Sequence, residues 1–280
     1  MKLPENSDYY FEIKQKASFS LNLTELLEYK ELFYFFTWRD VKVKYKQTAL
    51  GFLWAVLQPL VMMVIFTFFM GKAMNIPSDT MDYPIFAFSG LILWTVFSSG
   101  ITNAGNSMVS NAQIIKKIYF PRLIIPVSAI FVAVFDFLIA FLVFIVLLIA
   151  FQQPVNILQA LIFWPAGLVL TVISAFGPGC LLAALNVKYR DFRYVIPFLV
   201  QALLFVTPVI YPMSMVPYLW VKYALAINPM YAAMTLFRLP MMQTSLEMPF
   251  VWISIVSGIV FFFFGLAYFR KTEMYFADLA

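Results

Sequence analysis

Histidine is absent from this chain of 280 residues, and cysteine occurs once, at Cys180. Without histidine, the sequence lacks the commonest metal ligand and a frequent general base. A single cysteine excludes an internal disulfide and any site built from several thiolates. We therefore assign no catalytic residue, no metal ligand and no cofactor to this chain, and expect a protein that is not an enzyme.

Charged residues are also scarce. They make up 12% of the chain, whereas hydrophobic residues make up 63% and the mean hydropathy is +0.86. A soluble domain has about 25% charged and about 45–50% apolar residues. This composition predicts an integral membrane protein, because one core cannot bury so much apolar surface. The net charge of +5 is too small to indicate nucleic-acid binding.

The uncharged stretches of the sequence are long enough for six membrane-spanning helices. Such a helix needs about 20 consecutive apolar residues. The stretch between Asp136 and Lys188 is too long for one span, and the polar residues from Gln152 to Asn156 divide it in two. The expected spans are residues 50–70, 85–102, 124–150, 158–185, 195–211 and 249–269.

The basic residues favour one orientation of these spans. With the N-terminus in the cytoplasm, 16 basic residues lie in cytoplasmic segments and three lie outside, at Lys72, Lys222 and Arg238. The positive-inside rule therefore places both termini in the cytoplasm. The polar N-terminus predicts no signal peptide. We expect a cytoplasmic segment at 1–48, a transmembrane domain at 49–270 and a cytoplasmic tail at 271–280.

The segment before the first span predicts an amphipathic helix. Asn22 can cap the N-terminus of a helix, and Glu25, the third residue of that helix, can complete a capping box with it. Leu26, Tyr29 and Phe33 follow at helical spacing. We expect this helix to lie in the membrane interface, and packing against a partner protein is the alternative.

Basic and aromatic residues follow directly. On a helix, Arg39, Lys42 and Lys46 share one face, whereas Trp38 and Tyr45 share another. One interpretation is an anchor to lipid headgroups and the membrane interface. The other is a site that grips a phosphorylated lipid headgroup beside an entrance to the protein. The candidate residues are Trp38, Arg39, Lys42, Tyr45 and Lys46.

Two loops expected on the cytoplasmic side, 111–122 and 186–193, are short, basic and aromatic. They serve either as topology determinants alone or as a docking surface for a cytoplasmic partner. The candidate docking residues are Lys116, Lys117, Tyr119, Arg122, Lys188, Tyr189, Arg190 and Arg193.

The external segment 212–248 is apolar but interrupted by prolines, which a lipid-exposed span would not tolerate. We expect two short helices, near 216–226 and 229–238, that re-enter the outer leaflet or cap a pathway. Their aromatic residues either line a sugar path or form an interfacial belt. The candidate gate residues are Tyr211, Tyr218, Trp220, Tyr223 and Tyr231.

Asp136 lies inside the third expected span, where a carboxylate costs roughly 2.5–3.5 kcal/mol. Proton coupling is one interpretation. No second buried ionisable group and no intramembrane Lys or Arg is expected beside it, so a hydrogen bond to a Ser, Thr or Tyr of a neighbouring helix is favoured. Gly177-Pro178-Gly179 in the fourth span predicts a kink or a point of close helix packing.

The sequence contains no Walker A motif, so this chain does not bind ATP in the P-loop manner. One buried carboxylate serves ion coupling poorly, and inverted repeats are not apparent. A separate ATPase chain is the expected energy source for any transport.

Several segments, in order along the chain, resemble ABC-2 type polysaccharide-export permeases. The resemblance covers residues 25–278 and is greatest for exporters of O-antigen and related lipopolysaccharide or capsule. The segments are 45–54 (YKQTALGFLW) with Gln58-Pro59-Leu60, 114–122 (IIKKIYFPR), 186–193 (NVKYRDFR), 208–212 (PVIYP), 228–230 (NPM) and 269–273 (FRKTE).

The resemblance implies a homodimer of six-span permeases in the bacterial inner membrane, each bound to one P-loop ATPase subunit that holds ATP and Mg. The substrate would be a polysaccharide attached to a polyprenyl pyrophosphate lipid, and O-antigen is the polysaccharide that the resemblance favours. It would be moved from the cytoplasm to the periplasm. The N-terminal helix and residues 38–46 would form the lipid entrance, the basic loops would contact the ATPase, and the external helices would form the periplasmic gate.

Other functions stay open at this point. Within the same family, the substrate would be teichoic acid, capsule, a drug or a small lipid. Outside it, the chain would be a membrane-embedded transferase acting on polyprenyl lipids, or a proton-coupled flippase that depends on Asp136.

Overall fold

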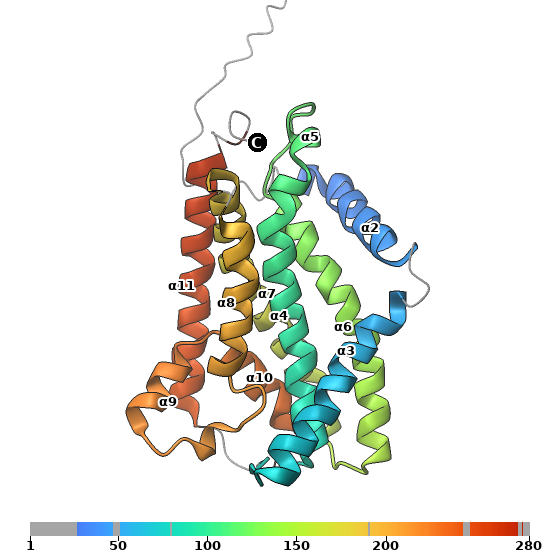
Figure 1. Ribbon diagram of the computed structural model, residues 1–280, viewed down its shortest axis with the longest axis vertical. Helices are drawn as coiled ribbons and strands as arrows, with labels where there is room; N and C mark the ends of the chain where they lie inside the picture. Colours follow the sequence, from blue (N-terminus) through green and yellow to red (C-terminus); the bar gives the residue numbers. More distant parts are fainter. Residues whose placement is uncertain are drawn as a thin grey trace, which may run out of the picture.

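The computed structural model describes residues 27–46, 51–78, 80–189, 191–242, 247–273 and 276. All regular structure within these residues is helical, and the long helices form one elongated bundle (Figure 1). This confirms the prediction of an all-α protein. The expected helix start at 21–26 and the candidate residue Arg190 lie outside the described residues.

Among the described residues, six helices run along the bundle, and Figure 1 shows their arrangement. Five are long and apolar enough to cross a membrane. The sixth, α8, has 15 residues and is about 22 Å long, shorter than a hydrocarbon core of about 30 Å. The six are α3 (Gly51–Phe66) continued by the π-helix η1 (Thr67–Ala73), α4 (Tyr83–Ser110), α6 (Ile124–Ala150), α7 (Ile157–Lys188), α8 (Phe192–Val206) and α11 (Met248–Glu273).

Shorter helices mark the two ends of the bundle. At one end, called here the α2 end, lie α2 (Lys30–Lys46) and α5 (Ala112–Ile115). At the opposite end, the α9 end, lie α9 (Leu219–Ala226) and α10 (Met230–Arg238) (Figure 1). These two helices match the expected external pair, and their entry into a membrane stays a prediction. The 3-10 turns η2 (Met213–Met215) and η3 (Leu239–Met241) flank them.

The core is centred on α4, the most buried of the five candidate spans. It packs against α6 and α7 along most of its length. At the α9 end, Phe88 of α4 stacks with Phe144 of α6, which also contacts Phe237 of α10. These rings are completely buried, so aromatic packing holds α10 inside the bundle.

The end of α8 differs from the prediction. The span was expected at 195–211, whereas the helix runs from Phe192 to Val206 and Thr207 is extended, with ψ of 135°. Thr207 precedes Pro208, and the proline ring disfavours the α conformation in the residue before it. The chain therefore leaves the helix early, and the carbonyls of Pro208 and Val209 need partners from elsewhere.

Arg238 supplies these partners. Its Nη1 donates to the carbonyl oxygen of Pro208 at 3.1 Å, and its Nη2 donates to that of Val209 at 2.7 Å. The same guanidinium reaches the Phe86 carbonyl at 3.0 Å and Ser89 Oγ at 3.2 Å on α4. Arg238 is only 5% exposed. From the sequence it was counted among the charges outside the membrane, and the structure shows that its side chain is buried, where it joins α10 to α4 and to the segment after α8.

Helices α7 and α11 meet at two glycines. A Cβ added to Gly265 would lie 1.9 Å from the carbonyl oxygen of Gly177, and a Cβ added to Gly177 would lie 2.2 Å from that of Phe261. The two backbones are therefore in direct contact. This confirms the expected close packing at Gly177-Pro178-Gly179.

We predict that Gly265→Ala separates α7 from α11 and lowers stability by about 1–3 kcal/mol, as expected for overpacking. The measurement is the thermal midpoint of the purified protein in detergent. Gly100→Ala is the matched control, because its added Cβ would meet the nearest atom at an ordinary 3.4 Å. Equal midpoints for the two variants would contradict the contact.

Candidate functional site

The side chain of Asp136 joins α2 to α6. Asp136 is 4% exposed, and its Oδ1 accepts a hydrogen bond from the Tyr45 hydroxyl while its Oδ2 pairs with Lys44 Nζ. The hydrogen bond to a tyrosine confirms the expectation for Asp136. The expectation that no Lys or Arg accompanies it is wrong, because α2 lies beside α6 and brings Lys44 to the carboxylate.

Tyr45 faces the bundle. Its ring stacks on Phe52 with the centroids 4.3 Å apart and contacts Phe135 of α6 at 5.9 Å. Burial and the neighbouring Asp136 carboxylate raise the pKa of the Tyr45 phenol above its ordinary value. The phenol therefore stays protonated and acts as a donor to Asp136, which makes Tyr45 a residue that positions α2.

The outer side of α2 carries a crevice of about 330 Å³. Lys42 Nζ lies 5.3 Å from the centre of the Trp38 ring, within the range of a cation–π contact. Trp38 thus joins the basic residues, contrary to the expected grouping with Tyr45, because it lies one turn before Lys42. This α2 crevice is lined by Phe35, Trp38, Arg39, Lys42, Val43 and Lys46.

Arg39 is held in place at one edge of the α2 crevice. Its Nε donates to Asp40 at 2.8 Å, and its Nη2 donates to the side-chain oxygen of Asn111 after α4, also at 2.8 Å. Its guanidinium lies 4.8 Å from the centre of the Phe36 ring. Arg39 therefore links α2 to α4, whereas Lys42 and Lys46 reach outward from the helix.

The first basic loop projects from the α2 end. Tyr119 is 81% exposed at its tip, and Lys116 and Lys117 are exposed beside it. Arg122 differs from these three, since its backbone N–H donates to Glu273 Oε1 at 3.0 Å and its guanidinium donates to the Glu273 carbonyl. The loop thus has a fixed base on α11 and an exposed aromatic and basic tip.

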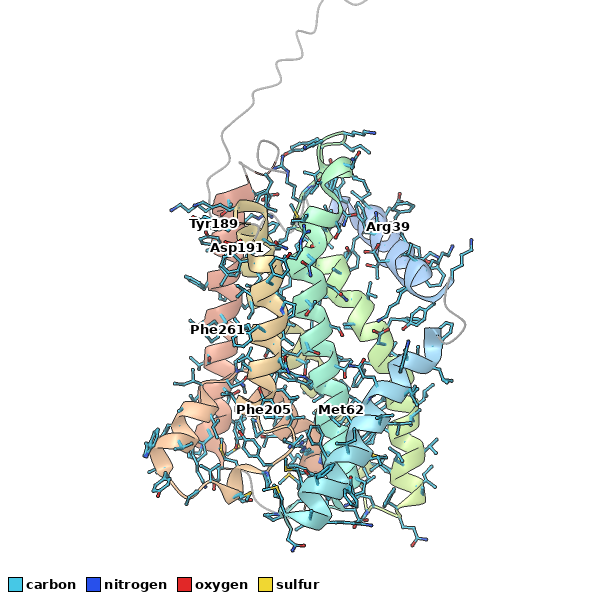
Figure 2. The ribbon with its side chains drawn as sticks, viewed as in Figure 1. Arg39, Met62, Tyr189, Asp191, Phe205 and Phe261 are labelled. Carbon is cyan, nitrogen blue, oxygen red and sulfur yellow. The ribbon has the colours of Figure 1, made fainter. Side chains whose placement is uncertain are left out.

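The second basic loop joins α7 to α8. Lys188 Nζ lies 5.0 Å from the centre of the Tyr189 ring, and Arg193 is exposed. Figure 2 places Tyr189 and Asp191 at the same end of the bundle as Arg39. The α2 crevice and both basic loops therefore share one end of the protein, as the sequence predicted.

The candidate gate residues separate into two groups. Tyr218 and Trp220 are largely exposed, and Tyr223 is half-exposed and contacts Phe250 edge-on at 5.1 Å. Tyr231 is buried in the apolar cluster between α9, α10 and α11. Tyr211 packs against the same cluster, and its hydroxyl donates to the Phe205 carbonyl at 3.2 Å.

Two contacts of buried charged side chains were not predicted from the sequence, although the sequence contains a feature that indicates each of them. Asp136 is isolated in an apolar segment and therefore needs a partner. Lys44 is the basic residue next to Tyr45, the aromatic residue whose hydroxyl reaches Asp136. Arg238 stands in an apolar segment that contains several prolines, where broken helices leave carbonyls without partners.

We predict that Lys44→Met and Tyr45→Phe each loosen α2 from α6. Each change leaves a buried carboxylate oxygen short of a partner, which costs about 1–3 kcal/mol. Amide hydrogen exchange along α2 should therefore accelerate on the order of tenfold. Lys42→Met, on the outer side of the same helix, is the control and should leave exchange unchanged. Equal exchange in all three variants would show that Asp136 does not hold α2.

Comparisons with known proteins identify the family of this chain. A family model described as ABC-2 type transporter matches residues 31–242. The O-antigen export system permease protein RfbA of Klebsiella pneumoniae is 30% identical over 247 residues, which cover 86% of this chain and 92% of that relative. An RfbA of Myxococcus xanthus is 28% identical over 217 residues, covering 76% and 81% of the two chains. The polysialic acid transport protein KpsM of Escherichia coli is 24% identical over 244 residues, covering 84% and 91%. This chain belongs to the ABC-2 type transporter family.

Proposed function

We propose that this chain is the membrane permease of an ATP-driven exporter that moves a lipid-linked polysaccharide, of the O-antigen type, out of the cytoplasm. Membership of the ABC-2 transporter family and the names of its relatives support a role in polysaccharide export. The name of KpsM, polysialic acid transport protein, makes a polysaccharide of the polysialic acid type the second candidate substrate.

The proposed membrane arrangement has six spans, with both termini and the α2 end in the cytoplasm. The clustering of 16 of the 19 basic residues in segments of that side supports this orientation. We take α8 as the sixth span because it runs beside α4, and a short span is accommodated by local thinning of the bilayer. A second copy of the chain would complete the pathway, and α9 and α10 would close it at the periplasmic side.

The observation that carries the proposal is the combination of side chains in the α2 crevice. Lys42 and Lys46 are cations suited to the phosphates of a polyprenyl pyrophosphate. Phe35, Trp38 and Val43 give the same crevice an apolar wall, which suits the first isoprene units of the lipid. A ligand with a doubly phosphorylated head and an apolar tail satisfies both parts.

The exposed aromatics of the α9 end fit a periplasmic gate for sugars. Tyr218, Trp220 and Tyr223 present ring faces or edges beyond the bundle, and aromatic faces pack against the C–H faces of sugar rings. Such contacts are weak and tolerate many registers, which lets a long glycan slide. Tyr211 and Tyr231 would support the gate from within the packed cluster.

The two basic loops fit a docking surface for a cytoplasmic P-loop ATPase, which would bind ATP and Mg and supply the energy. Tyrosine is enriched at protein interfaces, and charged residues lie in their polar rim. Tyr119 would be the central contact, with Lys116, Lys117, Lys188, Tyr189 and Arg193 around it. Arg190 is included by its place in the loop, and Arg122 would fix the base of the first loop.

We predict that Lys42→Gln combined with Lys46→Gln weakens binding of polyprenyl pyrophosphate about tenfold or more, because two charge-assisted contacts are lost. The measurement is the affinity of the full chain in nanodiscs for the radiolabelled lipid. Lys72→Gln, at the opposite end of the bundle, is the control. Affinity equal to that of the unaltered chain would mean that these lysines only anchor α2 to the membrane surface.

We also predict that Tyr119→Ala reduces co-purification of the chain with the proposed ATPase partner. Tyrosines at the centre of an interface commonly contribute 2 kcal/mol or more, or about thirtyfold in affinity. Tyr218→Ala, a largely exposed tyrosine at the opposite, α9 end, is the control. The two variants should share the thermal midpoint of the unaltered protein. Full co-purification of the Tyr119 variant would remove this loop from the interface.

A further inference from the structure

A second, larger pocket lies on the inner side of α2. It has a volume of about 730 Å³, within the range of about 300–1,000 Å³ that small-molecule sites occupy. Arg39 and Val43 line both this pocket and the α2 crevice, so the two spaces are adjacent. Its walls come from α2, α4 with the following turn, and α6. The lining residues used below are Val43, Asn103, Asn106, Ser110, Gln113 and Val132.

The α4 wall of this pocket continues as a polar stripe along the helix. Between Thr95 and Ser110, every α4 residue that is not buried has a hydroxyl or amide side chain, except Val109. This is unusual for a helix whose other face forms the apolar core, since polar groups gain nothing from facing lipid. The stripe comprises Thr95, Ser98, Ser99, Thr102, Asn103, Asn106 and Ser110.

Many of these side chains already use their hydrogens within the helix. Thr95 Oγ1 donates to the Leu91 carbonyl at 2.8 Å, and Ser110 Oγ donates to the Asn106 carbonyl at 3.0 Å. The hydroxyl oxygens keep lone pairs that face outward as acceptors. The exposed amides of Asn103 and Gln113 offer both donors and acceptors to the pocket.

We propose that this pocket binds a sugar residue of the transported glycan, the one attached next to the pyrophosphate, through the amides of Asn103 and Gln113. This rests on the proposed function, because the headgroup in the α2 crevice places the adjoining sugar here. A pyranose has hydroxyl edges and apolar C–H faces. The amides suit the edges, and Val43 and Val132 suit the faces.

The other ligands that such a space admits fit less well. A lipid chain would leave the amides of Asn103 and Gln113 without partners, which costs free energy in an apolar surrounding. The Asp40 carboxylate is engaged by Arg39 and the Asp136 carboxylate by Lys44, so neither is arranged for a cation. A neutral, hydroxyl-rich ligand satisfies the remaining groups.

The test compares two probes on the full chain in nanodiscs: polyprenyl pyrophosphate, and the same lipid bearing one N-acetylhexosamine. The unaltered chain should bind the sugar-bearing lipid about tenfold more tightly, as expected for one or two net hydrogen bonds. Asn103→Leu combined with Gln113→Leu should abolish this difference and leave the affinity for the sugar-free lipid within about twofold. Both positions are exposed, so the variant should keep the thermal midpoint of the parent.

Gln159→Leu is the matched control, because it removes an exposed amide from α7 outside the pocket and should preserve the tenfold difference. The proposed sugar site is overturned if the Asn103 and Gln113 variant keeps the tenfold difference in affinity between the two probes. It is also overturned if the unaltered chain binds both probes equally. Neither result affects the headgroup site. Failure of the unaltered chain to bind either probe contradicts the proposed function itself, and the pocket with it.

Discussion

The contact of Asp136 with Lys44 and Tyr45 determines the architecture of the α2 end. A carboxylate on an otherwise apolar helix is costly to bury, and two donors from one turn of α2 offset that cost. The contact fixes α2 at an angle against α6 (Figure 1). It thereby forms the polar pocket between α2 and the bundle, on the inner side of α2. The α2 crevice is lined by residues of α2 alone and lies on the outer side of the same helix.

A buried charge has a corresponding role at the α9 end. The Arg238 guanidinium supplies donors to carbonyls that Pro208 leaves outside the α8 helix. In both places a charged side chain attaches a segment that would otherwise have no regular contact with the bundle. Within the described ranges, Asp136 and Arg238 are the buried charged residues, and they hold the irregular parts of the bundle. Most of the other basic residues that the structure describes lie at the α2 end.

The sequence predicted most helices to within a few residues, because apolar length and polar breaks determine where a span begins and ends. It did not predict the early end of α8, since the local effect of Pro208 outweighs the hydropathy of the residues that follow. Contacts between segments far apart in sequence were also missed, including Lys44 with Asp136 and Arg39 with Asn111. Periodicity assigns a residue to a face, whereas the partner of that face depends on tertiary packing. Trp38 is a different case, because its contact with Lys42 follows from their separation of one helical turn and not from tertiary packing.

The proposed function combines these features in one route for a lipid-linked glycan, from the α2 crevice through the polar face of α4 to the aromatics of the α9 end. The most direct test is transport in proteoliposomes that contain this chain, with and without the proposed ATPase partner. We expect the glycan lipid to cross the bilayer only when both proteins and ATP are present. Transport at the full rate by this chain alone would contradict it.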